Sequence, residues 1–190
     1  MTRYFLHGGE FEDGGGLDPH YFSQLLHFDD KKHVRLLLVY FARPIAKWPY
    51  LFEEDKRIID QCAIDSVDIR EATFADFHNE LLWADAVFFK GGDGPILTDH
   101  LSHYHDLRET FKGKNIGGTS AGVNALSKYY YSQRGHKVIE GLGILNMKVF
   151  THYEERLRDE YADLEQTGEE LEIVTIPEGE FVIRESEDYS

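Results

Sequence analysis

One serine stands at the centre of a glycine-rich turn in the segment NIGGTSAGVNAL, residues 115–126. The core of this segment, GTSAG, fits the pattern G-x-S-x-G, in which a sharp turn between a strand and a helix projects the serine hydroxyl into the open. The amide of the next residue, Ala121, begins the helix and can donate to an oxyanion. A strand-like run precedes the motif and a helix-like run follows it. We therefore predict Ser120 as a nucleophile, with a purely structural glycine turn as the alternative.

A nucleophilic serine needs a base, and the base needs an acid that orients it. The candidate base is His152, at the end of the strand-like run MKVFTHY. The candidate acid is Glu178, which stands between Pro and Gly directly after the apolar run LEIVTI; a simple turn glutamate is the alternative. His7 and His136 are weaker candidates for the base.

The segment DHLSHYHD suggests a second kind of chemistry, because His100 and His103 could share one helix face and hold a metal ion. His105 would point elsewhere on such a helix, and no cysteine or second histidine cluster completes a ligand set. We therefore interpret the segment as a polar helix face, and expect neither a metal ion nor a cofactor.

The glycine-rich segment KGGDGP, residues 90–95, follows a buried strand-like run. Its glycines allow close approach and unusual backbone angles, so an amide of this loop can face the serine turn. A phosphate-binding turn is the alternative, but the Lys-Ser/Thr ending of a P-loop is absent.

Short apolar runs alternate with longer amphipathic runs along the chain. Strands are predicted at residues 3–8, 34–42, 66–71, 86–92, 114–118, 147–153, 171–179 and 180–185, the last two as a hairpin. Helices are predicted at residues 17–28, with Asp18 as N-cap, and at 50–63, 74–84, 96–112, 121–126 and 154–166. This alternation predicts parallel strands joined by right-handed crossovers, with helices on both faces. Candidate residues then gather at the carboxyl ends of the strands.

Composition limits the class of protein. A chain of 190 residues with 42% hydrophobic content suits one domain spanning residues 1–190. The net charge of −15 disfavours binding to nucleic acid or to an anionic membrane. No apolar run is long enough to span a bilayer, so we expect a cytoplasmic protein. The single cysteine, Cys62, lies in an apolar run and is interpreted as a buried small hydrophobe.

Four motifs in this order, KGGDGP, GTSAG, THY and IPEG, resemble the dipeptidase E (aspartyl dipeptidase) and cyanophycinase family of serine peptidases. The resemblance implies an α/β fold, a flavodoxin-like three-layer αβα sandwich with a mostly parallel sheet, similar to class I glutamine amidotransferases. It also implies a catalytic triad of Ser120, His152 and Glu178. The implied oxyanion hole combines the amide of Ala121 with that of Gly92 or Asp93.

The resemblance further implies a small peptide as substrate, cleaved through an acyl-enzyme. Dipeptidase E prefers an aspartate at the amino end of its substrate, which needs a cationic partner. Arg134 is the candidate, against an arginine that only faces solvent, and Asn124 is a second candidate for substrate binding. The loop GGDG departs from the three consecutive glycines common in the family. The alternative function is therefore a non-catalytic or differently specific amidotransferase-like protein that binds a small molecule at the same sheet edge. The oligomeric state is left open, with a homodimer as one alternative.

Overall fold

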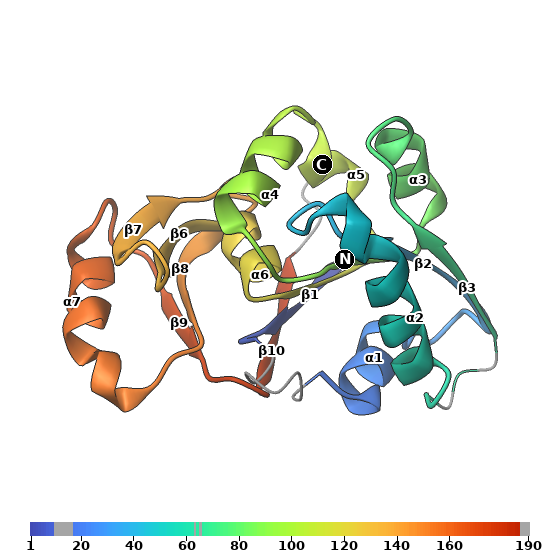
Figure 1. Cartoon of the computed structure of the whole chain (residues 1–190), viewed down its shortest axis with the longest axis horizontal. Coiled ribbons are helices and arrows are strands. Elements are labelled where there is room, and N and C mark those ends of the chain that lie inside the picture. Colours follow the sequence, from blue (N-terminus) through green and yellow to red (C-terminus); the bar gives the residue numbers. More distant parts are fainter. Residues whose placement is uncertain (10–16, 63, 65, 187–190) are drawn as a thin grey trace.

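The computed structural model describes residues 1–9, 17–62, 64 and 66–186. Within them, six strands form the larger sheet, in the order β10-β1-β5-β4-β2-β3 (Figure 1). These strands are β1 (Thr2–His7), β2 (His33–Val39), β3 (Ser66–Glu71), β4 (Ala86–Phe89), β5 (Asn115–Thr119) and β10 (Phe181–Ser186). Strands β1 to β5 pair in parallel, whereas β10 runs antiparallel to β1 at the edge. The predicted mostly parallel sheet is confirmed.

Helices cover both faces of this sheet, which gives the predicted three-layer αβα sandwich. One face carries α1 (Pro19–Leu25) and α2 (Trp48–Ile59), and the other carries α3 (Phe77–Trp83), α4 (Gly94–Ser102), α5 (Leu107–Thr110) and α6 (Ala121–Leu126). Two adjacent residues of β5 face helices on opposite sides of the sheet. A side chain at Gly117 would meet Leu25 of α1, whereas one at Gly118 would meet Gly122 of α6. The Asp18 side chain caps α1 by accepting from the Tyr21 amide at 3.0 Å, as predicted.

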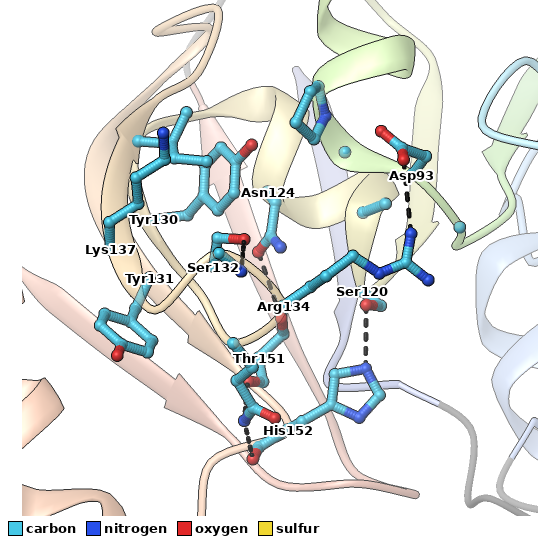
Figure 2. Close-up of a pocket in the computed structure, with 17 residues that line it drawn as sticks. Asp93, Ser120, Asn124, Tyr130, Tyr131, Ser132, Arg134, Lys137, Thr151 and His152 are labelled. Atoms are coloured by element: carbon cyan, nitrogen blue, oxygen red, sulfur yellow. Dashed lines mark hydrogen bonds and ion pairs between the residues drawn. The ribbon is translucent and has the colours of Figure 1, made fainter.

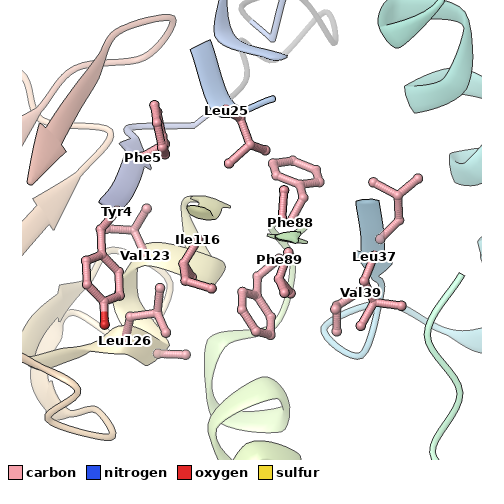
Figure 3. Close-up of a cluster of buried hydrophobic side chains, with 14 of the residues drawn as sticks. Tyr4, Phe5, Leu25, Leu37, Val39, Phe88, Phe89, Ile116, Val123 and Leu126 are labelled. Atoms are coloured by element: carbon pink, nitrogen blue, oxygen red, sulfur yellow. The ribbon is translucent and has the colours of Figure 1, made fainter. Parts of the chain in front are cut away.

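The core is formed on both sides of the central strands, and β4 illustrates how. Phe88 and Phe89 are fully buried and point to opposite faces of the sheet (Figure 3). The Phe88 ring lies 5.1 Å from Phe22 of α1, and the Phe89 ring lies 6.0 Å from Phe111 at the end of α5. Burial of one such side chain contributes about 1.5–3 kcal/mol. A strand buried on both faces therefore explains the continuous apolar run in the sequence.

A second, four-stranded sheet in the described residues has the order β7-β6-β8-β9. Its strands are β6 (Ser127–Ser132), β7 (Lys137–Glu140), β8 (Leu145–Thr151) and β9 (Ile173–Ile176), and η2 (Glu155–Leu157) and α7 (Arg158–Gln166) connect the last two. Figure 1 shows this sheet beside the larger one, with α7 on its outer side. The sequence pattern did not predict β6 or β7, and the strand before His152 was expected in the main sheet. That strand is β8, which belongs to the second sheet.

Two further predictions are wrong. The predicted hairpin of residues 171–179 and 180–185 does not form, because β9 pairs in parallel with β8 while β10 pairs with β1. The turn between them therefore crosses from one sheet to the other. The predicted helix 96–112 is two helices, since the chain turns after Ser102. This turn packs the ring of Tyr104 against Phe77 at 4.9 Å.

An ion cluster ties the amino ends of the central strands together, away from the carboxyl ends. Asp85, just before β4, accepts hydrogen bonds from Arg35 (2.9 and 3.0 Å) and Lys31 (2.5 Å). Burial acts to raise the pKa of the Asp85 carboxyl, but these hydrogen bonds outweigh it and hold that pKa well below its usual range. The carboxylate therefore stabilises the fold without contacting the candidate site. No helix among the described residues is long and apolar enough to cross a membrane.

Candidate active site

Ser120 occupies the turn between β5 and α6, with φ 46° and ψ −106°. This left-handed φ is uncommon for a residue with a side chain. The turn packs tightly, since a Cβ at Gly118 would lie 2.9 Å from the backbone of Gly122, and one at Gly122 would lie 2.3 Å from the carbonyl oxygen of Phe89. The glycines of the G-x-S-x-G pattern are therefore required by close backbone approach. They leave the serine at the carboxyl end of β5, lining a pocket.

Three side chains form a continuous hydrogen-bonded chain at this point. The Oγ of Ser120 lies 2.9 Å from Nε2 of His152, and Nδ1 of the same imidazole lies 2.6 Å from Oε1 of Glu178. Figure 2 shows the first of these contacts. A carboxylate accepts only, so Nδ1 carries the proton and donates to Glu178. Nε2 is then the acceptor that faces the serine hydroxyl.

The last residue of β1 and the two residues after it, residues 7–9, support Ser120, His152 and the turn that carries Glu178. Their successive carbonyl groups accept the amides of Ser120 (3.0 Å), His152 (2.9 Å) and Gly179 (3.0 Å). The two sheets are thus joined where the three side chains meet. This role was not predicted from the sequence, although the glycine pair, Gly8 and Gly9, that closes the first predicted strand is a usable signal.

Gly9 sets the position of the imidazole most directly. It has φ 133°, and a Cβ there would lie 2.1 Å from Cε1 of His152. The other two base candidates have different surroundings. The ring of His7 is fully buried, and its Nδ1 accepts from the Gly9 amide at 3.1 Å. His136 lies in the exposed turn between β6 and β7.

The glycine loop after β4 lies beside the serine. The Gly91 amide donates to Thr119 Oγ1 at 2.8 Å, and the Asp93 amide donates to the carbonyl of Ala42 at 2.9 Å. The Asp93 amide is therefore engaged, and the prediction that it serves an oxyanion needs correction. The amides of Gly92 and Ala121 donate to no acceptor in the part of the chain that the structure describes, and both residues line the pocket at Ser120.

A pocket of about 370 Å³ opens from Ser120 toward β6 and β7. Asn124 is buried at its base, where its Oδ1 accepts from Thr151 Oγ1 at 3.2 Å. The Tyr130 hydroxyl is buried and finds no partner among the described residues, and burial raises the pKa of Tyr130 to about 12. Arg134 extends across the pocket to Asp93 (Figure 2), with 3.4 Å between Nη1 and Oδ2. The pocket therefore offers donors to a polar ligand.

The histidines considered for a metal ion have other partners. The His100 ring lies 4.6 Å from the ring of Phe74, and Nδ1 of His103 lies 2.9 Å from the Asp99 carbonyl. Within the described residues, no group of three or more His, Cys, Asp and Glu side chains could hold a metal ion.

A serine on a strand-to-helix turn, joined through one imidazole to a carboxylate, is the arrangement of a serine hydrolase. Comparison with known families identifies the kind of hydrolase. The model of peptidase family S51 matches residues 5–190, so the chain belongs to this family and is a serine-type peptidase. The expected resemblance to peptidase E is confirmed.

Solved structures agree on the fold. A peptidase from an acI-B1 Actinobacterium is 19% identical, with a TM-score of 0.70, over 97% of this chain and 83% of that chain. A protein from Listeria monocytogenes EGD-e, assigned as a peptidase E, is 15% identical, with a TM-score of 0.61, over 98% of this chain and 100% of that chain. No curated protein matches the sequence.

Proposed function

We propose that this protein hydrolyses a peptide bond of small peptides through a Ser120-His152-Glu178 triad and an acyl-enzyme. The observation that carries the proposal is the unbroken chain of hydrogen bonds, of 2.9 and 2.6 Å, from the serine hydroxyl through the imidazole to the carboxylate. Such a chain lets the imidazole accept the serine proton while the carboxylate stabilises the imidazolium that forms.

In the first half-reaction, Ser120 Oγ attacks the scissile carbonyl carbon and His152 Nε2 takes the hydroxyl proton. The resulting oxyanion accepts hydrogen bonds from the amides of Gly92 and Ala121. Loss of one such donor typically lowers turnover about 10²- to 10³-fold. The C–N bond then breaks as His152 returns its proton to the leaving amine. In the second half-reaction, a water molecule attacks the acyl carbon while His152 Nε2 takes a proton from it. The bond from that carbon to Ser120 Oγ then breaks, His152 returns the proton to Oγ, and the acyl group leaves as a carboxylic acid.

The pocket beside the serine suits a polar or acidic part of the substrate. Arg134 is 85% exposed and its contact with Asp93 is 3.4 Å long, so this ion pair is weak and a substrate carboxylate can replace it. The amide nitrogen of Asn124 and the buried hydroxyl of Tyr130 supply further donors. An unpaired buried hydroxyl is costly, and a ligand that accepts from it recovers that cost.

Hydrolysis of a panel of dipeptides and tripeptides, followed by mass spectrometry, tests the proposal. Wild-type protein is expected to cleave members of the panel, and Ser120→Ala is expected to reduce cleavage to background while its circular dichroism spectrum is unchanged. A chelator should leave the wild-type rate unchanged, because no step uses a metal. Full activity of Ser120→Ala would overturn the proposal. Binding of peptides by folded wild-type protein without cleavage would instead favour a non-catalytic relative.

A further inference from the structure

A second pocket lies on the other side of the glycine loop from the first. Its volume is about 650 Å³, and it is formed by the segment after β2, the segment before α3 and the start of α4. Gly92, Asp93 and Arg134 line both pockets. The two cavities therefore meet at the loop that supplies the proposed oxyanion donor, and one extended ligand can occupy both.

The lining of the second pocket is unusually apolar for an exposed surface. Ile45, Phe74 and Ile96 are 65%, 40% and 49% exposed, and all three line it. They belong to three separate segments of the chain, so the fold gathers them in one place. Contiguous exposed apolar side chains mark sites where a ligand or partner is bound.

Aromatic rings give one wall of this pocket a fixed shape. The rings of Phe41 and Phe74 stack with centroids 4.4 Å apart, and the His100 ring lies 4.6 Å from that of Phe74. A pre-formed aromatic wall accepts a flat or branched apolar group with little loss of conformational freedom. The role of His100 is thus to pack beside a pocket.

The charged side chains at the pocket are mainly cationic, although the whole chain carries a net charge of −15. Among the described residues, the charged side chains that line it are those of Arg43, Lys47 and Arg134, together with the carboxylate of Asp93. Arg43 also donates through Nε to the carbonyl of Gly91, which attaches this rim to the glycine loop. The local charge suits a peptide that carries a carboxylate near its apolar group.

We propose that this second pocket, lined by Phe41, Ile45, Phe74, Ile96 and His100, is a substrate subsite. It binds an aromatic or branched aliphatic residue of the same peptide whose scissile carbonyl faces Ser120. The inference rests on the proposed peptidase function, and it adds a second specificity to the polar pocket beside the serine.

The test compares kcat/KM for peptides in which one position at a time carries Phe, Leu or Ala. For wild-type protein we expect Phe or Leu to exceed Ala by about tenfold or more at one position, the usual discrimination of an apolar pocket. Phe74→Ala and, separately, Ile96→Ala should remove most of this preference, because kcat/KM for the Phe and Leu peptides should fall toward that for the Ala peptide. Ile96 is half exposed, so its variant keeps the test valid if Phe74→Ala disturbs the packing of Phe41. Leu82→Ala is the matched control, because Leu82 is 57% exposed on α3 and lines neither pocket.

The outcomes separate the two proposals. If wild-type protein cleaves the peptides without apolar preference at any position, or keeps its preference in both pocket variants, the subsite is wrong while the peptidase function stands. If wild-type protein cleaves none of the peptides, the proposed function fails first. An equal loss of preference in Leu82→Ala would also overturn the assignment of this pocket.

Discussion

A buried ion pair directly behind the glycine loop allows a quantitative test of how the site is held. Lys90, the residue before Gly91, places its ammonium 2.8 Å from a carboxylate oxygen of Asp55 on α2. The two side chains are 2% and 0% exposed. The hydroxyl of Tyr40 donates to the other carboxylate oxygen at 2.9 Å. Through Asp55, Tyr40 and Lys90 therefore join the carboxyl ends of β2 and β4 to α2, beneath the loop that carries Gly92.

Removal of one member leaves a buried charge without its main counter-charge, which costs about 3–5 kcal/mol. We expect this loss of unfolding free energy for Lys90→Met and for Asp55→Asn. With a urea m-value of about 2 kcal/mol/M, typical for a chain of this size, the unfolding midpoint should fall by about 1.5–2.5 M. The double variant should lose less than the sum of the two single variants, because it contains neither buried charge.

Urea unfolding followed by circular dichroism provides the measurement, and peptide hydrolysis below the unfolding transition provides a second readout. We expect kcat to fall in the single variants, because the glycine loop loses its anchor. A shift in free energy below about 1 kcal/mol, within the range of an exposed ion pair, would refute the reasoning. So would strict additivity in the double variant.

Three further predictions concern the site and its support. Glu178→Gln should lower kcat about 10²- to 10⁴-fold, because a neutral amide no longer fixes the imidazole tautomer; wild-type turnover would contradict the triad. Gly9→Ala should lower kcat about 100-fold by displacing that imidazole, whereas Gly113→Ala, at another glycine of positive φ but with open space around it, should not; equal effects would rule out the positional role. The pKa of Asp85 is lower in the folded protein than in the unfolded chain, where it is about 4, so the ionised carboxylate stabilises the protein at pH values above about 4. This contribution is lost as the pH falls below that value. Unfolding midpoints at pH 7 and pH 3 should therefore differ more for wild-type protein than for Asp85→Asn, and an identical difference in both proteins would contradict this.

The larger sheet could be predicted because its central strands are short, continuous apolar runs that can be recognised without knowing their partners. Runs such as AVFF and VRLLLV are apolar throughout, as expected for strands with helices on both faces. The GTSAG turn was predictable for the same reason, since both of its glycines and its serine lie within five residues. The residues of the proposed triad carried clear signals too, each at the end of a strand-like run.

The second sheet was harder to predict, because its strands are paired by contacts distant in the sequence. β6 contains three consecutive tyrosines and follows α6 without a break, so no turn residue marks its start. The partner of β10 is β1, near the other end of the chain. A short IPEG turn between two strands favours a hairpin by sequence alone, and only the open edge of β1 decides against it.

The roles of the segment after β1 and of the Asp93 amide also depended on tertiary structure. Whether an amide in KGGDGP is free depends on the carbonyl of Ala42, which lies about fifty residues away in the chain. Gly9 makes room for the His152 ring because it has no Cβ, and the only sign of this role in the sequence is a pair of adjacent glycines. Sequence patterns therefore indicated the side chains of the proposed triad more clearly than the backbone that positions them.

The central claim is that Ser120 is a nucleophile activated by His152, and covalent labelling tests it most directly. Wild-type protein treated with a fluorophosphonate should gain the mass of one phosphonyl group, and digestion should place this group on the peptide that contains Ser120. Ser120→Ala should gain no mass, and His152→Ala should react far more slowly. Folded wild-type protein that gains no label, or that carries the label on another residue, would contradict the account.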